Sequence, residues 1–335
     1  MALAVAAPVQ SASPAIFSLD RATSSRASHV SHVSQVATAC PFPRDARVAA
    51  HLDAFALASA ARPSARQDSH KHRAWRLRIR ASTGDTAASS SSSQDVPQEA
   101  KDRAAAVEKA RSLVGDLKGT SIFLPGMMGS GKTTVGTLLA GLLGYCFFDS
   151  DRVVEAAAGG ASVSHIFAEN GEEEFRQLET RVLAELSSMG RLVVATGGGA
   201  VTRPVNWSYL SHGVTVHLDV PVEHLAQRVL AVGTAVRPLL SQATQGEGEG
   251  GEQQAADESD EHSKTLTRLA GLLGERKALY SNADTTISLQ EVAMRCDSQV
   301  DEVTPTRIAL EILERLEQMV AERQARDAAL RAKAA

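Results

Sequence analysis

Residues 121–134 read SIFLPGMMGSGKTT, and this stretch decides the fold. The apolar run at 122–124 predicts a β-strand, and the apolar spacing over 132–143 predicts a helix. The turn between them fits the pattern G-x-x-x-x-G-K-[ST] at Gly126, Gly131, Lys132 and Thr133. Strand, loop and helix in this order form the context in which the pattern binds phosphate. The alternative is a glycine-rich turn that binds nothing, and the lysine and threonine in register argue against it.

The chemistry of this loop predicts a nucleotide ligand. Glycines let backbone N–H groups turn towards phosphates at the N-terminus of a helix. Lys132 supplies a point charge for the β- and γ-phosphates, and the Thr133 hydroxyl is placed to ligate Mg²⁺. The residues expected to bind the nucleotide are Gly126, Gly129, Ser130, Gly131, Lys132, Thr133 and Thr134. The loop alone does not indicate which molecule accepts the phosphoryl group.

Strands and helices are expected to alternate along the rest of the chain. The predicted strands are 121–125, 145–148, 192–195, 214–219 and 285–289. The predicted helices are 98–117, 132–143, several across 150–190, 203–212, 221–232, 264–281 and 304–329. This alternation, with several unbroken apolar strands, predicts an α/β fold whose parallel sheet is covered on both faces. Beyond Glu322 the last helix becomes rich in Ala and Arg, and it is expected to fray there.

The N-terminal segment differs in charge from the remainder. Residues 1–80 carry 11 Lys and Arg against 4 Asp and no Glu, and they are rich in Ser and Ala. This composition predicts an organelle transit peptide, and the alternative is a disordered basic arm that binds nucleic acid. The whole chain has a formal charge of −4 and residues 1–80 contribute +7, so the remainder is near −11. Such an acidic remainder argues against nucleic-acid binding. No run approaches the roughly eighteen apolar residues of a membrane span.

Two low-complexity segments bound the expected domain, which covers 118–335. Residues 81–97 contain a serine run and precede a helix, so 81–117 is expected to be a linker and a leading helix. Residues 241–263 read SQATQGEGEGGEQQAADESDEHS, with seven Glu and Asp and no Lys or Arg. A segment with so little to bury is expected to be mobile. It lies within 237–264, where a lid over the nucleotide is expected.

Two further patterns follow predicted strands. Asp149 and Asp151 stand at the end of the second strand, where ligands sit in open α/β sheets. One carboxylate can face Mg²⁺ and the other a substrate hydroxyl; a surface acidic turn is the alternative. The glycines 197–199 follow the third strand, and a run without side chains lets a ligand lie directly against the backbone. A flexible turn is the alternative there.

Taken together, the motifs resemble the shikimate kinase family over residues 118–289. The stretches that carry the resemblance are GMMGSGKTT, DSD at 149–151, EEFR ending at Arg176, GGGA at 197–200, VGTAVRPLL at 232–240 and ERKALYSNAD at 275–284. VGTAVRPLL is similar to the plant branch, which agrees with a transit peptide and predicts a chloroplast location in the stroma. The resemblance implies a three-layer fold like that of the nucleoside monophosphate kinases, with a mobile lid. It also implies ATP-dependent phosphorylation of the shikimate 3-hydroxyl by a monomer.

The resemblance assigns roles residue by residue. Thr133 and Asp149 serve Mg²⁺, and Lys132 acts on the phosphates of ATP. Asp151 binds the 3-hydroxyl and helps to deprotonate or orient it, and Arg237 closes with the lid onto the transferring phosphoryl group and the nucleotide. Arg176 and Arg276 bind the shikimate carboxylate, and the backbone of Gly197, Gly198 and Gly199 lies against the ring. A guanidinium suits a carboxylate because it can bind both oxygens.

Two alternatives stay open at this point. GTSIFLPGM, FDSDRVVEAAAGG and VTPTRIALEILERLE are similar to plastid shikimate kinase-like proteins, some of which have lost kinase motifs and serve chloroplast development. The motif residues are all present in this chain, so a catalytic or a dual role is possible. A P-loop kinase for another small acceptor such as gluconate is weaker, because it leaves Arg176 and Arg276 without a carboxylate-bearing ring to bind.

Overall fold

The computed structural model describes residues 97–232 and 258–334. The predicted transit peptide, nearly all of the predicted linker, Arg237 and most of the predicted lid lie outside these ranges.

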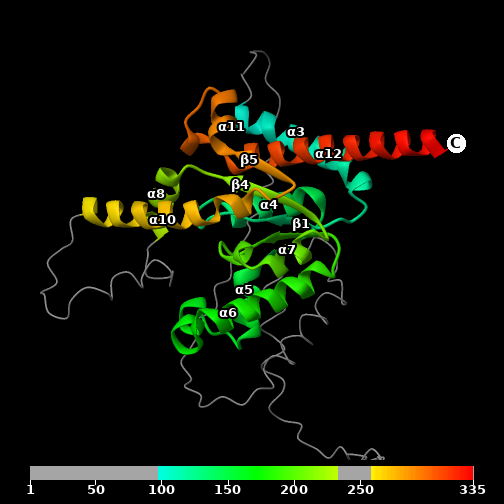
Figure 1. Cartoon of the computed structure of the whole chain (residues 1–335). Helices are drawn as coiled ribbons and strands as arrows, with labels where there is room; N and C mark the ends of the chain where they lie inside the picture. The colour runs from blue at the N-terminus through cyan, green and yellow to red at the C-terminus, as the bar shows by residue number, and fades with distance from the viewer. Residues whose placement is uncertain (1–96, 233–257, 335) are drawn as a thin grey trace, which may run out of the picture.

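A parallel sheet forms the centre of the molecule (Figure 1). Its strands are β1 (Ile122–Leu124), β2 (Cys146–Asp149), β3 (Leu192–Ala195), β4 (Val214–Asp219) and β5 (Thr285–Ser288). Their order is β2-β3-β1-β4-β5, and every neighbouring pair is parallel. Ala195 pairs with both Leu124 and Asp149 in register, so the carboxyl ends of β1, β2 and β3 meet at one edge. The predicted parallel α/β sheet is confirmed.

Helices cover both faces of this sheet. They are α3 (Gln98–Leu117), α4 (Lys132–Leu143), α5 (Ser150–Ala157), α6 (Val163–Ser187), α7 (Pro204–Leu210), α8 (Val222–Val232), α10 (Glu258–Tyr280), α11 (Leu289–Arg295) and α12 (Pro305–Ala334). Ile122 and Leu124 belong to one core with α3, α4 and α12, whereas Phe123 belongs to a second core with α6. The alternation along β1 therefore separates two hydrophobic layers, and Figure 1 shows helices on either side of the sheet.

Close packing of α4 on the sheet requires a glycine. A Cβ on Gly136 would lie 2.6 Å from the Phe147 ring and 3.1 Å from Leu124. A side chain at this position would push the helix away from β1 and β2. Because α4 begins at the end of the phosphate loop, this contact also fixes where the loop lies.

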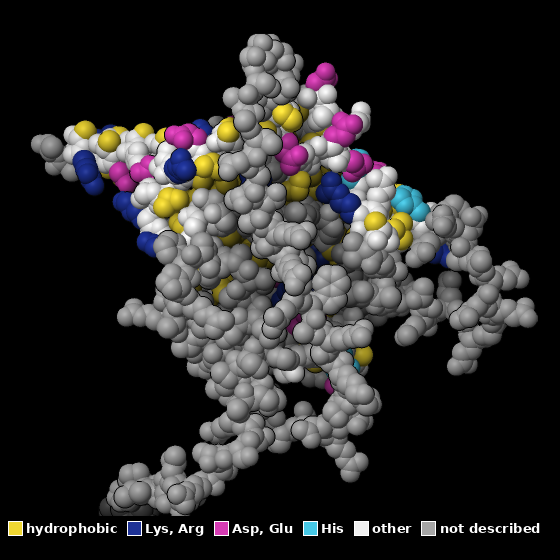
Figure 2. Space-filling model, turned by 180° about the vertical axis from the view of Figure 1, so that it is seen from behind, with side chains coloured by type: hydrophobic (Ala, Val, Ile, Leu, Met, Phe, Trp, Pro, Cys, Tyr) yellow, Lys and Arg dark blue, Asp and Glu magenta, His cyan; other side chains and the backbone are white. Residues whose placement is uncertain are grey.

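The predicted α3 is confirmed at both ends, and it runs against α12. Lys109 binds Glu317 at 2.7 Å, and Gln324 donates to Asp116 at 3.3 Å. The expectation that α12 ends at 329 is wrong, because the helix continues to Ala334. Figure 2 shows basic and acidic side chains mixed with hydrophobic ones along α12. The Ala-rich sequence has high intrinsic helix propensity, which explains the continuation into solvent.

Two other expectations differ from the structure. Helix α10 begins at Glu258 rather than at 264, so the last part of the segment expected to be irregular is helical. No glycine or proline occurs between 258 and 270, so the sequence allows the helix to begin before 264. The short α11, directly after β5, was not predicted.

No helix within the described ranges has both the length and the apolar character to cross a membrane.

Candidate active site

The phosphate loop owes its shape to two glycines with positive φ. Gly129 has φ 81° and Gly131, the N-cap of α4, has φ 88°. L-residues with a Cβ rarely adopt this conformation. A Cβ on Gly129 would also lie 3.3 Å from the Leu225 carbonyl. The loop is therefore formed by the backbone itself, with the N-terminus of α4 facing the space where a phosphate would bind.

Lys132 extends across the loop. Its Nζ donates to the Met127 carbonyl at 2.7 Å and lies 3.4 Å from Ser130 Oγ. Ser130 is buried, and Thr134 is exposed on the first turn of α4. Lys132 and Gly129 line the cavity described below, whereas Ser130 and Thr134 do not.

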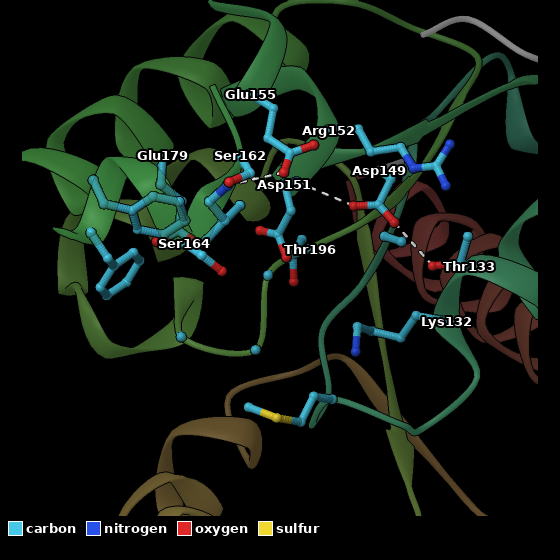
Figure 3. Close-up of a pocket in the computed structure, with 18 of the residues that line it drawn as sticks. Lys132, Thr133, Asp149, Asp151, Arg152, Glu155, Ser162, Ser164, Glu179 and Thr196 are labelled. Carbon is cyan, nitrogen blue, oxygen red and sulfur yellow. Dashed lines mark hydrogen bonds between the residues drawn. The ribbon is translucent and has the colours of Figure 1, made fainter. Parts of the chain in front are cut away.

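A carboxylate and a hydroxyl adjoin the loop at the end of β2. Thr133 Oγ1 donates to Asp149 Oδ2 at 2.9 Å, and Asp149 Oδ1 accepts from the Asp151 backbone at 3.2 Å (Figure 3). Asp149 is thus the N-cap of α5, which explains why the chain turns from strand to helix there. Among the described residues, no group of three or more His, Cys, Asp or Glu could hold a metal ion. One carboxylate and one hydroxyl still fit Mg²⁺, because Mg²⁺ takes few protein ligands and completes its shell with water and phosphate oxygens.

Asp151 follows on the first turn of α5 and faces the cavity. Burial, the Asp149 carboxylate and the Glu179 carboxylate raise its pKa to about 7, against the opposing effects of Lys132 and Arg176. A carboxyl group with this pKa changes its protonation state near neutral pH, which suits a group that accepts a proton from a hydroxyl. Figure 3 shows Asp151 beside Thr196, and Lys132 lines the same cavity.

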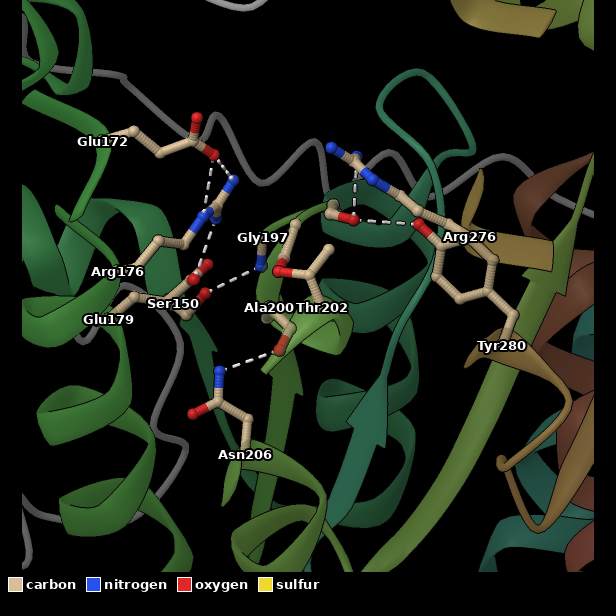
Figure 4. Close-up of polar contacts among 12 residues, drawn as sticks. Ser150, Glu172, Arg176, Glu179, Gly197, Ala200, Thr202, Asn206, Arg276 and Tyr280 are labelled. Atoms are coloured by element: carbon tan, nitrogen blue, oxygen red, sulfur yellow. Dashed lines mark hydrogen bonds and ion pairs between the residues drawn. The ribbon is translucent and has the colours of Figure 1, made fainter. Parts of the chain in front are cut away.

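Arg176 lies on the second part of α6, between two glutamates. The helix is broken at Gly171, where φ is 79°, and Glu172 begins the next turn. Arg176 Nη1 binds Glu179 Oε2 at 2.9 Å, and Nη2 binds Glu172 Oε1 at 3.1 Å (Figure 4). The Glu179 side chain is fully buried, whereas that of Glu172 is 55% exposed. Burial raises the pKa of Glu179, and the Arg176 charge opposes this effect.

The three glycines 197–199 form a wall of bare backbone. A Cβ on Gly197 would lie 2.5 Å from Asp151 Oδ1 and 2.6 Å from Glu179 Oε1. A Cβ on Gly199 would overlap the Arg176 guanidinium. The Gly197 N–H donates to Ser150 Oγ at 2.9 Å, which ties the loop to α5. Side chains here would displace the charged groups of the site, so the run of glycines is required by the close approach.

Arg276 reaches the same wall from α10. Its Nη1 donates to the Gly198 carbonyl at 3.1 Å, and Tyr280 OH donates to the same carbonyl at 2.9 Å (Figure 4). Arg276 is 5% exposed, so its charge is held inside the protein at the edge of the cavity.

One cavity of about 450 Å³ connects these groups. The predicted site residues that line it are Gly129, Lys132, Thr133, Asp149, Asp151, Arg176, Gly197, Gly198, Gly199 and Arg276. The cavity is not lined by Gly126, Ser130 and Gly131 of the loop or by Thr134 on the first turn of α4, and Arg237 lies outside the described residues. Glu179 and Thr196 also line the cavity and were not predicted. The sequence does contain a pattern that could have indicated the two partners of Arg176. Glu172 lies four residues before it and Glu179 three residues after it, and residues at these spacings share one face of a helix.

Three buried polar atoms of this cavity lack a protein partner. Among the described residues, Glu179 Oε1, Thr196 Oγ1 and Arg276 Nε are buried without a hydrogen bond. All three side chains line the cavity. Buried polar groups in native proteins are normally paired, by protein, water or ligand. Donors and acceptors left over at one place indicate a polar ligand.

A phosphate loop that faces acidic and arginine side chains across one cavity, at the carboxyl edge of a parallel sheet, defines a P-loop phosphotransferase for a small molecule. The family profile described as shikimate kinase matches residues 128–317. Shikimate kinase 3, chloroplastic, of Oryza sativa subsp. japonica is 48% identical over 217 residues, which cover 64% of this chain and 71% of the rice protein. The chain therefore belongs to the shikimate kinase family.

Further relatives have the same description. Shikimate kinase 1, chloroplastic, of Arabidopsis thaliana is 46% identical over 210 residues, which cover 62% of this chain and 64% of that protein. A solved structure, the shikimate kinase from Acinetobacter baumannii in complex with shikimate, is 33% identical. It covers 64% of this chain and 98% of the bacterial chain, with a TM-score of 0.47.

Proposed function

We propose that this protein transfers the γ-phosphoryl group of ATP to the 3-hydroxyl of shikimate in the plastid. Membership of the shikimate kinase family and 48% identity to a chloroplastic shikimate kinase support the activity and the compartment. The observation that carries the proposal is the single cavity that joins Lys132 of the phosphate loop to Arg176 and Arg276. These residues come from three separate segments of the chain, and they meet only because the sheet brings the segments to one edge.

The two arginines are assigned to the shikimate carboxylate. Both guanidinium groups are almost fully buried at the cavity, and a planar fork binds a carboxylate through two parallel hydrogen bonds. Arg276 Nε is among the buried atoms without a partner, so this arginine has a donor to spare. The glycine wall between the two arginines carries no Cβ atoms, so a six-membered ring can approach its backbone.

Arg176 must exchange one partner in order to bind substrate. Its guanidinium is occupied on one side by buried Glu179 and on the other by exposed Glu172. Because the Glu172 side chain is 55% exposed, water can solvate its carboxylate once another anion replaces it at Arg176. We assign Glu172 as the partner that the substrate carboxylate replaces, whereas Glu179 remains and keeps the guanidinium in place.

Asp151 is assigned to the acceptor hydroxyl. The hydroxyl group must lose its proton as its oxygen bonds to phosphorus, and a carboxylate beside it can take this proton. The neighbouring carboxylates Asp149 and Glu179 and the burial that raise the pKa of Asp151 make it a better proton acceptor than an ordinary aspartate. Lys132, on the opposite side, is assigned to the phosphates, where its charge offsets the charge that develops during transfer.

Thr133 and Asp149 are assigned to Mg²⁺. Their oxygens lie 2.9 Å apart beside the phosphate loop, and they are hard ligands of the type that Mg²⁺ prefers. When bound, the ion would neutralise charge on the β- and γ-phosphates. Thr133 and Asp149 hold each other in place, so the two ligand atoms are oriented together.

The remaining assignments concern the organisation of the chain, and several of them fall on residues outside the described ranges. We assign residues 1–80 to a plastid transit peptide and 81–117 to a linker with the leading helix. The kinase domain then covers 118–335, as a monomer, with a lid at about 237–264. Arg237 is assigned to the lid cation that closes on the phosphoryl group. Composition and the family resemblance support these assignments.

Shikimate-dependent release of ADP tests the proposal directly. The full chain with ATP and Mg²⁺ is expected to release ADP rapidly with shikimate and slowly without it. Shikimate methyl ester, which keeps the hydroxyls and lacks the carboxylate charge, is expected to be a poor substrate. A rate that is the same with and without shikimate would contradict the proposal and favour the alternative of a kinase-like protein without this turnover.

A further inference from the structure

The Gly198 carbonyl is the meeting point of two side chains from one helix. It accepts from Arg276 Nη1 at 3.1 Å and from Tyr280 OH at 2.9 Å (Figure 4). The two residues are four apart on α10, so they lie on the same face of the helix. The assigned carboxylate-binding arginine therefore shares its anchor on the wall of the cavity with a tyrosine.

Tyr280 is itself held from the opposite side. Its ring is 1% exposed and stacks on His217 of β4, with ring centroids 4.5 Å apart and planes at 6°. Burial lowers the pKa of His217 to about 4 and raises that of Tyr280 to about 12. Both rings are therefore uncharged at neutral pH, and the Tyr280 hydroxyl keeps the proton that it donates.

The wall at Gly198 needs such an anchor. Gly198 lies between two other glycines, and a backbone without Cβ atoms is the least restricted of all. With Arg276 as its only donor, the Gly198 peptide would be free to follow that side chain. A second donor fixed on the sheet through His217 makes the carbonyl a rigid acceptor. The Arg276 guanidinium is then bound to a carbonyl oxygen whose own position is fixed.

We propose that Tyr280 is a positioning residue for substrate binding: its hydroxyl fixes the Gly198 carbonyl, and this carbonyl orients Arg276 towards the acceptor. This inference rests on the proposed function, in which Arg276 binds the shikimate carboxylate. Tyr280 does not contact the acceptor in this arrangement; it affects the affinity for the acceptor by orienting Arg276. Phosphoryl transfer itself, at the other side of the cavity, is independent of Tyr280.

The test is Tyr280→Phe in the full chain, which keeps the stacked ring and removes only the hydroxyl. The KM for shikimate is expected to rise about three- to tenfold, the effect of one hydrogen bond. The kcat and the KM for ATP are expected to change less than about twofold. Tyr145→Phe is the matched control, because it removes another buried hydroxyl, which lies near Gly119 and Arg191 at the amino end of β2 and does not line the cavity. It is expected to leave both KM values unchanged.

A double-mutant cycle with Arg276→Ala separates positioning from a purely structural role. If Tyr280 acts through Arg276, Tyr280→Phe adds less than about twofold to the KM of the Arg276→Ala protein. A full additional three- to tenfold rise, or an equal rise in the KM for ATP, would overturn the inference. If Tyr280→Phe folds poorly, His217→Ala is the second variant. It removes the stacked ring and leaves the Tyr280 hydroxyl in place. It is expected to raise the same KM, and an unchanged KM would also overturn the inference.

The outcomes for the two proposals can be told apart. A parent protein without shikimate-dependent turnover would contradict the proposed function. A parent protein that phosphorylates shikimate, with a KM that Tyr280→Phe leaves unchanged, would contradict only the role of Tyr280.

Discussion

The phosphate loop and the acceptor side of the cavity are built in different ways. The loop is one continuous stretch, shaped by Gly129 and Gly131 and placed by the packing of α4. The acceptor side draws on α5, α6, the glycines 197–199 and α10, and its charges already bind one another. The loop is therefore a site that backbone geometry forms locally. The acceptor side is a site that tertiary packing assembles, and ligand binding must rearrange part of it.

The largest effect is expected at the loop. Lys132→Ala should lower turnover by at least about a hundredfold, because a charge at the transferring phosphates stabilises the transition state. The free energy of unfolding should change little, since Lys132 contributes no apolar side chain to either core. Coupled assays and thermal melts measure both quantities. Lys277→Ala, at an exposed lysine beside Arg276, is the control and is expected to keep full activity. An active Lys132→Ala protein would show that this loop does not serve the reaction.

Substitutions of the two arginines should separate the two regions. Arg176→Ala and Arg276→Ala should each weaken shikimate binding roughly ten- to hundredfold, the effect of losing a charge-assisted hydrogen-bonding partner. ATP binding should stay nearly unchanged in both variants. Titration calorimetry of the two ligands measures the difference, and equal losses for ATP and shikimate would contradict the assignment.

The same two variants should differ in stability. Arg176→Ala leaves the buried Glu179 without its ion-pair partner, which costs on the order of 3 kcal/mol in comparable cases. Arg276→Ala leaves the Gly198 carbonyl with its bond from Tyr280, so the loss should be smaller. Urea unfolding curves for the two proteins test this order.

The pH dependence should report Asp151. Its pKa of about 7 predicts that kcat/KM falls about tenfold per unit as the pH decreases below 7, because the protonated carboxyl accepts no proton. This folded-state pKa lies above the ordinary value of 3.8, so Asp151 lowers the stability of the fold progressively as the pH rises from about 4 to about 7, and the loss is complete above pH 7. Asp151→Asn should therefore be nearly inactive and should raise the melting temperature at pH 8 more than at pH 5. An active Asp151→Asn protein would contradict the assignment.

The smallest effect is expected at Glu172. Glu172→Gln removes the exposed carboxylate that competes for Arg176, so shikimate should bind up to about fivefold more tightly. Glu173→Gln is the matched control, because the neighbouring glutamate binds Arg203 instead. Weaker binding by the Glu172→Gln protein would mean that Glu172 holds Arg176 in its binding position and does not compete with the substrate.

The phosphate loop could be predicted from the sequence more fully than the acceptor side of the cavity. The loop, the parallel sheet and the strand ends could be predicted because they depend on local sequence patterns. The burial of the ion pair between Arg176 and Glu179 could not be predicted, because a glutamate on a helix is expected to be solvated and only tertiary packing buries Glu179. The short α11 was missed although Ser288 and Glu291 fit the first and last positions of a capping box, and Ser288 Oγ does accept from the Glu291 backbone. The stack of Tyr280 on His217 joins residues far apart in the chain, which no local pattern indicates.

The central claim is that phosphate bound at the loop is transferred to a small acceptor held by Arg176 and Arg276. The most direct test identifies the product of the full chain with ATP, Mg²⁺ and shikimate by ³¹P NMR and mass spectrometry. The account predicts shikimate 3-phosphate and ADP in equal amounts, with neither formed by the Lys132→Ala protein. ADP and inorganic phosphate without a phosphorylated shikimate would contradict it.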